Sequence, residues 1–465
     1  MRSKRDYQGV LDFQASHLKI TNEYYARYEA ISGILDETPR VLELAHRDLK
    51  EELERQAGAN GSRRRCEFTS DTVLRTLIAQ IIESESLRGI VVRIDDSIFL
   101  RRFVRVYDGP MMDFTTLGRL KNMIKPQTWK RINEALARGA VRNGEIEGDR
   151  LRLDTTAFET NIRWPSDSGL LWDTYRVLGR LIANARLIDP LITDGKRLAL
   201  RKVKKYHTGI HRAARRKNIE RIALKQAYSA MIAKVEDALS MASTVAKRLL
   251  RSHRSVDVAQ WLAEDLEHYR ALGVRVVGQA RRRVLQGETV PNDEKIFSIF
   301  EPHTELLKRG KAGKPIEFGH MILLQQVEGC FITGYETFAR KPVEHGLVDT
   351  VLKDHQKLFG ELPSELSADK GFYESTKKLR DLEREIDVVS IGKKGKRTAD
   401  EAEREASAEF KLAQRFRAGI EGSISVLKRA LRMFRCFNRG FDRFTATVGA
   451  TILAHNLLVL ARGGG

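Results

Sequence analysis

The distribution of strand-like and helical patterns is the feature that most constrains the fold of this 465-residue chain. The segment 151–156 alternates like a strand and carries Asp154 near its end. Strand character returns at 318–326 and 330–338, and the Gly-containing turn between these runs predicts an antiparallel hairpin. Between the two parts, residues 170–290 have long helical patterns. We therefore expect one sheet built from both parts of the chain, with a large helical insertion between them.

The remainder of the chain continues the alternation of helices and strands. The elements expected there are a helix at 343–358, a strand at 365–368 that ends at Asp369, a helix at 375–385, a strand at 386–391 and a long helix at 402–434. This is the order of a ribonuclease H-like core, a mixed sheet flanked by helices. We predict an α/β fold whose core comprises residues 146–170 and 301–465, separated by a basic helical insertion at 171–300.

The charge of the chain is strongly positive. There are 82 Lys and Arg residues against 62 Asp and Glu, a net charge of +20. Such an excess attracts polyanions and favours nucleic acid as the partner, although a soluble protein with a basic surface would have the same composition. Residues 201–255 alone contain 15 Lys or Arg against 3 Asp or Glu. This density favours phosphate contact over a merely solvated helix face. The candidate DNA-binding residues are Lys202, Lys204, Lys205, Arg212, Arg215 and Arg216.

The N-terminal region, residues 1–145, reads as mostly helical. Apolar residues at helical spacing predict an amphipathic helix over 71–88, and Asp113 or Thr115 is the candidate N-cap of a later helix. A helical, partly basic region ahead of the core is consistent with recognition of DNA ends. A dimerisation module would have the same pattern, so both interpretations stay open.

The cysteines and apolar segments indicate the compartment. Cys66, Cys330 and Cys436 are far apart and form no paired motif, which argues against a disulfide framework or a zinc site. No run approaches eighteen consecutive apolar residues, and the first residues lack an apolar signal core. We therefore expect a soluble cytoplasmic protein without a membrane segment.

Three acids are the candidates for chemistry. Asp154 and Asp369 each lie at the end of a predicted strand, where side chains can share a cleft, although such acids often cap turns or helices. Glu421 shares a helix face with Arg417 and Lys428, which are four positions before it and seven after it. Carboxylate oxygens are the ligands that Mg²⁺ and Mn²⁺ prefer, and two such ions can cleave a phosphodiester.

The helix around Glu421 has a second notable feature. A surface ion pair between Arg417 and Glu421 would explain their spacing, but Gly419 and Gly422 are poor helix formers. Glycine at these positions could allow a DNA backbone or another helix to come close.

The motifs around these acids resemble those of DDE transposases from bacterial insertion sequences. The spacing Arg417-x3-Glu421-x6-Lys428 matches the last three residues of their Y-R-E-K signature, and Gln414 stands where the signature has tyrosine. The segments 153–156 and 367–373 resemble those that carry the family's two aspartates. Segment 161–173 and the closing segment 452–457 are similar to further parts of such transposases, so that the likeness covers about 70–170 and 315–460. The large insertion before the hairpin departs from many members, which place theirs before the last acid.

The resemblance implies a function and the residues that perform it. Asp154, Asp369 and Glu421 would bind two Mg²⁺ or Mn²⁺ ions, and water and then a freed 3′-hydroxyl would be the nucleophiles. Arg417, Lys428, Arg429 and Lys370 would contact DNA phosphates. The partners would be double-stranded DNA, both the terminal inverted repeats of a mobile element and its target, and a second copy of the chain in a dimer or higher multimer. The protein would be bacterial and associated with the nucleoid.

Two alternatives share the same sequence features. One is a transposase-derived protein that binds DNA but no longer cuts it, and the presence of all three acids argues against it. The other is a related nuclease or resolvase that cuts without strand transfer.

Overall fold

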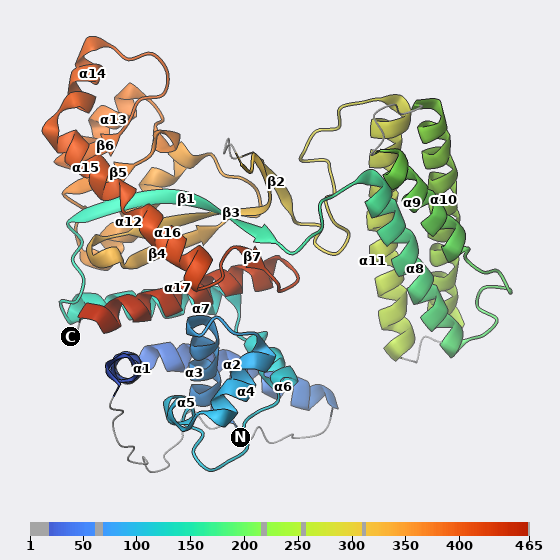
Figure 1. Cartoon of the computed structure of the whole chain (residues 1–465), viewed down its shortest axis with the longest axis horizontal. Coiled ribbons are helices and arrows are strands. Elements are labelled where there is room, and N and C mark those ends of the chain that lie inside the picture. Colours follow the sequence, from blue (N-terminus) through green and yellow to red (C-terminus); the bar gives the residue numbers. More distant parts are fainter. Residues whose placement is uncertain (1–17, 61–67, 215–220, 253–256, 309–312, 464–465) are drawn as a thin grey trace. The chain divides into compact units, whose positions relative to one another are not determined.

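The computed structural model describes residues 18–60, 68–214, 221–252, 257–308 and 313–463 (Figure 1). The chain forms two compact units, one made of residues 1–159 and 320–465 and the other of residues 160–319. The expected helical insertion, 171–300, lies within the second unit. The N-terminal helices belong to the same unit as most of the sheet.

A mixed sheet lies mostly in the first unit, and its residues 305–308 and 316–319 belong to the second. Its seven strands are β1 (Arg150–Thr160), β2 (Glu305–Lys308), β3 (Ile316–Gln326), β4 (Ile332–Thr337), β5 (Glu365–Ala368), β6 (Val388–Ile391) and β7 (Arg435–Cys436). The order is β2-β3-β1-β5-β6, with β4 also paired to β3 and β7 paired to β1. Strands β1, β5 and β6 run parallel, whereas β3 and β4 form the predicted antiparallel hairpin. The expected α/β class is therefore confirmed.

Alternation along β1 directs the site residues to one face of the sheet. Leu151 and Leu153 are fully buried in the larger hydrophobic core of the unit. Because successive side chains of a strand point to opposite faces, Arg152 and Asp154 lie on the other side. There they contact the helix that precedes Glu421.

Seven helices precede β1 in the described residues. They are α1 (Lys19–Glu37), α2 (Pro39–Asn60), α3 (Ser70–Ile82), α4 (Leu87–Asp96), α5 (Ile98–Val104), α6 (Phe114–Lys121) and α7 (Pro126–Arg142). Asp113 accepts a hydrogen bond from Thr115 N at 2.8 Å, which confirms it as the N-cap of α6. The single helix predicted over 71–88 is wrong at its C-terminal end. α3 stops at Ile82, Ser84 has a positive φ of 52°, and Ser86 caps α4.

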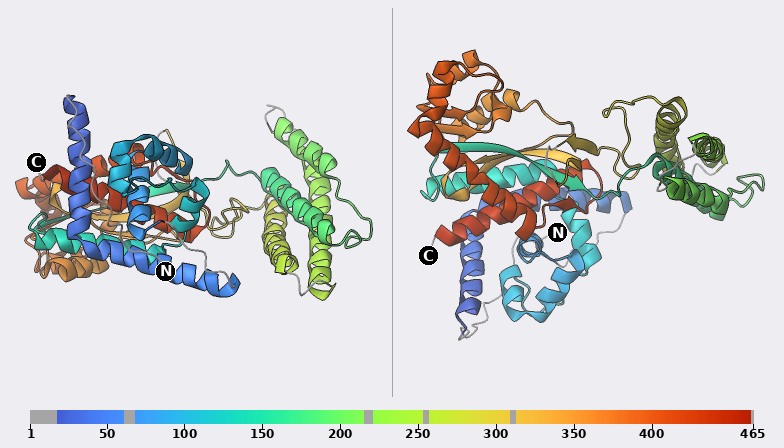
Figure 2. Two further views of the ribbon diagram at one scale, coloured as in Figure 1. Left: turned by 90° about the horizontal axis from the view of Figure 1, so that it is seen from below. Right: turned by 45° about the horizontal axis from the view of Figure 1, so that its top comes forward.

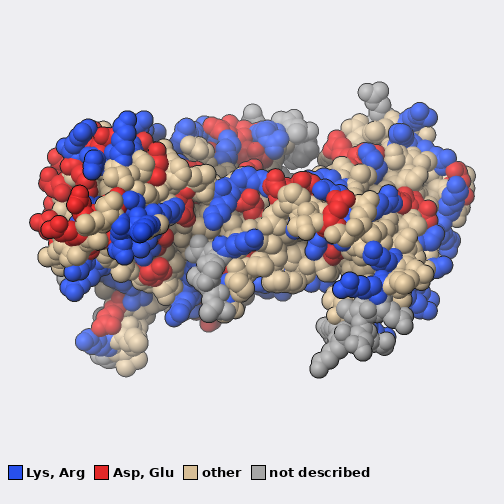
Figure 3. Space-filling view, turned by 90° about the horizontal axis from the view of Figure 1, so that it is seen from above, with Lys and Arg blue, Asp and Glu red and all other residues tan. Residues whose placement is uncertain are grey.

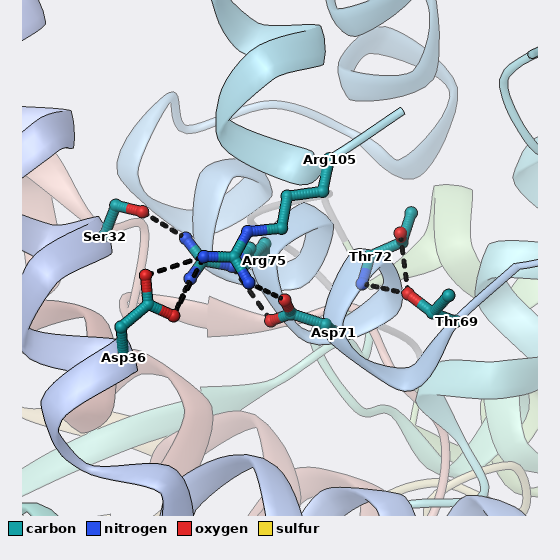
Figure 4. Close-up of polar contacts among 7 residues, drawn as sticks. All are labelled: Ser32, Asp36, Thr69, Asp71, Thr72, Arg75 and Arg105. Atoms are coloured by element: carbon teal, nitrogen blue, oxygen red, sulfur yellow. Dashed lines mark hydrogen bonds and ion pairs between the residues drawn. The ribbon is translucent and has the colours of Figure 1, made fainter. Parts of the chain in front are cut away.

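A buried ionic network joins three of these helices (Figure 4). The Arg75 side chain, on α3, is 0% exposed and donates to Asp71, Asp36 and Ser32. Arg105, the residue that ends α5, donates to the same two aspartates. Because a buried guanidinium needs its charge and its donors satisfied, this network fixes α1, α3 and α5 against one another.

The helices after the hairpin cover the sheet. They are α12 (Val348–Phe359), α13 (Thr376–Leu382), α14 (Ala399–Ala406), α15 (Ala408–Ala418), α16 (Ile420–Ser425) and α17 (Phe441–Gly463), with short 3₁₀ helices η3 (Glu344–Leu347) and η4 (Lys370–Phe372) and a π-helical turn η5 (Val426–Ala430). A further 3₁₀ helix, η2 (Glu328–Cys330), forms the turn of the hairpin. α15 packs on β5 and β6, and α7 and α17 pack against β4.

The single long helix predicted over 402–434 is wrong. Ser407 leaves helical geometry and caps α15 with its side chain, and Gly419 separates α15 from α16. The closing helix α17 is long and apolar enough to cross a membrane by length and composition, yet 67% of its apolar window is buried inside the unit. Its apolar composition therefore reflects a core position.

The second unit contains a bundle of long helices (Figure 2). These are α8 (Asp167–Ile188), α9 (Leu200–Ala213), α10 (Arg221–Ser252) and α11 (Asp257–Ala280), and α11 continues into the π-helical turn η1 (Arg281–Gln286). A separate hydrophobic core lies among them. The helical pattern read from 170–290 is therefore confirmed.

Candidate active site

Asp154 is buried on the face of β1 that contacts α15. Its side chain is 7% exposed. Arg417 Nη2 donates to Asp154 Oδ2 at 2.8 Å, and the backbone N–H of Thr155 donates to Oδ1 at 2.7 Å. Both carboxylate oxygens therefore have a donor. The partner of Arg417 is this aspartate on the neighbouring strand, and not Glu421 on its own helix segment.

The electrostatics of Asp154 reflect a shared acidic environment. Burial raises the pKa of its carboxyl from 3.8 to about 6, and Arg417 opposes that shift. Glu421 raises this pKa further, the Thr155 N–H lowers it, and Asp369 raises it. Negative charge on Glu421 and Asp369 disfavours ionisation of Asp154, and this effect is smaller than that of burial.

The pairing of β1 and β5 explains why Asp154 and Asp369 are neighbours. Arg152 pairs with Ser367 in parallel register. Asp154 follows two residues later within β1, and Asp369 follows two residues later, just past the end of β5. Asp369 is half-buried and caps η4, since its Oδ1 accepts from Gly371 N at 2.7 Å. Glu421 is exposed in the first turn of α16.

Glu344 is a fourth acid beside the two aspartates, and sequence reasoning missed it. Thr155 Oγ1 donates to Glu344 Oε1 at 2.6 Å. A Cβ atom on Gly371 would collide with Glu344 Oε2, so the second carboxylate oxygen lies against the turn that Asp369 caps. In the sequence, Glu344 resembles an ordinary acid in the first turn of a helix. The residues that Glu344 contacts, Thr155 and Gly371, come together because β1 pairs with β5.

Arg152 anchors the segment that carries Arg417 and Glu421. Its Nη1 donates to the Phe416 carbonyl at 2.6 Å, and its Nε donates to Gln326 Oε1 at 2.8 Å. The guanidinium also lies 4.5 Å from the centre of the Phe416 ring. A Cβ atom on Gly419 would collide with Arg152 Nη1. This glycine therefore accommodates a neighbouring side chain, whereas the space around Gly422 is open.

Gln414 occupies the position of the signature tyrosine. Its Nε2 donates to Ser390 O at 2.8 Å, to Ser390 Oγ at 2.9 Å and to Ala368 O at 3.3 Å. Ala368 ends β5, immediately before Asp369. The amide therefore ties α15 to the ends of β5 and β6, which is a structural role for the residue that departs from the signature.

The predicted DNA-binding residues fall into two groups. Near the acids, Lys370 and Arg429 are exposed and Lys428 is half-buried in the turn η5. In the second unit, Lys202, Lys204, Lys205 and Arg212 are exposed on α9, while Val203 and Ile210 face the bundle. Arg215 and Arg216 lie outside the described residues. On the face drawn in Figure 3, basic and acidic side chains are interspersed, so surface charge alone does not single out a binding band there.

The fit of a divalent metal depends on donor chemistry and on spacing. Three carboxylates are suitable donors for Mg²⁺ or Mn²⁺. Within the described part of the chain, however, no group of three His, Cys, Asp or Glu side chains is arranged to hold an ion. Asp154 is engaged with Arg417 and Thr155 instead. The donor types therefore fit, although the carboxylates are not gathered into a coordination shell.

The predicted position of Asp154 at the end of a strand is wrong, because β1 continues to Thr160 and Asp154 lies within it. Asp369 directly follows the parallel strand β5, and Glu421 is on a flanking helix. Carboxylates are the donors that metal-dependent phosphodiester chemistry uses. Residues 293–457 match the sequence model of a family described as the transposase DDE domain. This segment contains Asp369, Glu421 and Glu344 and begins after Asp154. Neither the curated proteins nor the solved structures gave a match to the chain. The family match supports a transposase function, and such a domain fits a ribonuclease H-like fold.

Proposed function

We propose that this protein is a DNA transposase that binds the ends of a mobile element, cleaves them and joins them to target DNA with the help of divalent metal ions. The observation that carries the proposal is the match of residues 293–457, which include Asp369 and Glu421, to a transposase DDE domain. The parallel pairing of β1 with β5 and the ion pair between Arg417 and Asp154 support it.

The three acids would hold Mg²⁺ or Mn²⁺, two ions in each site. When bound, the ions would activate the attacking hydroxyl and stabilise charge on the leaving oxygen. Water would attack a phosphodiester at the element end and release a 3′-hydroxyl. That hydroxyl would then attack a target phosphodiester, forming one bond to phosphorus and breaking another.

The basic residues have two different tasks in this proposal. Arg417 holds the Asp154 carboxylate in the free protein, and with Lys370, Lys428 and Arg429 it would contact phosphates around the scissile bond. Because a guanidinium can bind carboxylate or phosphate with equal geometric ease, Arg417 can exchange one partner for the other.

The exposed cations of α9 are proposed to bind the DNA backbone. Other basic side chains of the second unit have carboxylate partners, for example Arg248 with Asp194 and Arg281 with Glu236. Among the described residues, Lys202, Lys204, Lys205 and Arg212 have no such partner. Unpaired cations on one helix attract phosphates without first having to break an ion pair.

The test uses a supercoiled plasmid that carries the DNA flanking the gene on both sides, with Mg²⁺ or Mn²⁺. Wild type is compared with Asp154→Ala, Asp369→Ala and Glu421→Ala, and with Glu409→Ala, an exposed acid on α15, as the control. We expect wild type and the control to cut and join, while the three variants bind DNA but are inert. Full activity in any of the three would remove that acid from the site.

Two further outcomes would redirect the proposal. Binding without cleavage by wild type would indicate a DNA-binding protein derived from a transposase. Cleavage without joining of a pre-cut 3′-hydroxyl end would indicate a nuclease or resolvase.

A further inference from the structure

We infer that a basic pocket between the end of α6 and the start of α17 is a binding site for a phosphate of the DNA backbone. The pocket lies within the first unit, and its lining includes neither the three acids nor the cations of α9. The inference rests on the proposed function, because it names a further part of the protein that would contact DNA.

The pocket is a cavity of about 240 Å³ with a mainly basic polar lining. A single water molecule needs about 10–15 Å³ of such space, so a larger group can enter. The polar side chains that line the pocket are Lys121, Asn122, Lys125, Asn438, Asp442 and Arg443. Three of these residues are cations and one is an acid, so the lining attracts an anion.

Lys121 is placed in the pocket by the helical spacing of α6. It follows Leu117 by four residues, and Leu117 is 0% exposed, so the two side chains share the buried side of the helix. Burial lowers the pKa of the Lys121 ammonium, and Cys436 opposes that shift. No carboxylate pairs with Lys121 among the residues that the structure describes. Because a half-buried charge without a partner is costly, an apolar side chain would serve packing better here, whereas a bound anion would neutralise the ammonium.

The other two cations of the pocket are also open to an anion. Arg443 is exposed at the start of α17 and has no ion-pair partner in the described part of the chain. Lys125 pairs with Glu51 at 3.1 Å on the surface, where such pairs contribute little stability. Asp442, the one acid of the lining, forms no ion pair with these cations within the described ranges. The positive charge of the pocket is therefore not neutralised from within.

The exposed side of α6 favours DNA over a protein as the source of the anion. Thr115, Arg119 and Asn122 are spaced by four and three residues and are all exposed, so they share one face beside the pocket. Side chains of these types bond phosphates and base edges in DNA complexes. None of the large apolar residues of α6 is exposed, although the centre of a protein interface is usually apolar. A duplex with one phosphate in the pocket could therefore continue along this face.

The experiment measures how the DNA affinity of the full chain depends on salt. A labelled duplex from the DNA flanking the gene is titrated by fluorescence anisotropy between about 50 and 200 mM salt. Lys121→Gln and Arg443→Gln are compared with wild type, singly and together. The control combines Arg55→Gln with Arg384→Gln, two exposed arginines of the same unit that have carboxylate partners. Thermal unfolding confirms that each variant is folded.

We expect each single variant to reduce the slope of log affinity against log salt concentration by about 1, and the double variant by about 2, as the loss of one and two phosphate contacts requires. The control should keep the wild-type slope. Arg443→Lys, which keeps the charge, should keep it as well. Because Arg443 is exposed, its two variants decide the matter even if Lys121→Gln does not fold.

The outcomes separate this inference from the proposed function. A wild-type slope in the double variant, with normal DNA cleavage, would overturn the inference alone. Loss of self-association in sedimentation, again with a wild-type slope, would also overturn it and would indicate that the pocket takes an acidic segment of a second copy. If Asp154→Ala, Asp369→Ala and Glu421→Ala cleaved DNA normally, the proposed catalytic site would fail while the slopes still decided the pocket. A wild type that binds no DNA would contradict both.

Discussion

Arg417 Nη2 donates to Asp154 Oδ2 at 2.8 Å, so the helix segment before Glu421 is joined to the strand that bears the first acid. Arg417→Gln should reduce DNA cleavage by 100-fold or more, on the order of the effect of losing one charge-stabilising donor. Because other cations still contact the backbone, DNA binding should weaken no more than about threefold. Arg415→Gln, an exposed change on the same helix, is the control. Equal cleavage by both variants would show that Arg417 has no part in the reaction.

The pH dependence of stability should report the buried carboxylate of Asp154. Its pKa is raised from 3.8 to about 6, chiefly by burial, so the folded protein binds this proton more tightly than the unfolded chain does. Without metal, its contribution to stability is therefore greatest at low pH and declines as pH rises from about 4 to 6. The loss is on the order of 2–3 kcal/mol at most. Thermal unfolding of Asp154→Asn between pH 4 and 7 should lack this decline, and an unchanged slope would contradict it.

Two glycines three residues apart should respond in opposite ways to alanine. Gly419→Ala places a methyl group against Arg152 Nη1 and should cost about 1–3 kcal/mol of unfolding free energy, typical of overpacking. Gly422→Ala enters open space within α16 and should stabilise the protein by up to about 1 kcal/mol through helix propensity. Denaturant unfolding of the pair decides the matter. Destabilisation of similar size in both would mean that the Arg152 contact is not what requires glycine.

The N-terminal ionic network should be far more important for stability than an exposed ion pair of similar length. Arg75→Met removes one of the two arginines that pair with buried Asp71, while Arg105 keeps the other contact, and should cost about 3 kcal/mol. Arg55→Met removes a solvent-exposed pair with Glu52 and should cost less than about 1 kcal/mol. Urea denaturation compares the two variants. If Arg75→Met were as stable as Arg55→Met, the network would not be what holds α1, α3 and α5 together.

The cations of α9 should contribute to DNA affinity in a salt-dependent manner. Changing Lys202, Lys204, Lys205 and Arg212 together to Gln should reduce the slope of log affinity against log salt concentration by about 3, if most of them contact phosphates. The matched control changes four arginines of the same unit that have carboxylate partners, namely Arg248, Arg270, Arg281 and Arg282. If the salt dependence of DNA affinity had the same slope in both variants, the DNA would not bind along α9.

The sequence was informative where local pattern determines structure. The structure contains the predicted hairpin, the strand before Asp369 and the long helices of the second unit. Each of these elements has an apolar periodicity in its own sequence that predicts it. The long helix at 402–434 was predicted wrongly because apolar spacing continues through its breaks. Ser407 interrupts it with a non-helical ψ of 153° and a side-chain cap, and Gly419 separates α15 from α16.

The site was less predictable than the elements that carry it. Motif spacing identified Asp154, Asp369 and Glu421 as candidates, and their assignment as metal ligands remains a prediction. Glu344 and Arg152 act through contacts between segments that are 170 or more positions apart, for example Arg152 with Gln326. Such contacts follow from strand order and register, which a single sequence does not encode locally.

The place of β1 in the sheet has a consequence for synthesis of the protein. Its neighbours β3, β5 and β7 all begin at or after residue 316, whereas β1 ends at Thr160. During translation, the strand that bears Asp154 therefore leaves the ribosome more than 150 residues before any partner strand exists. A product terminated within the second unit would expose an unpaired strand and would be a target for aggregation or proteolysis. Gene copies truncated there should thus yield no persistent fragment able to compete with the full-length protein for DNA.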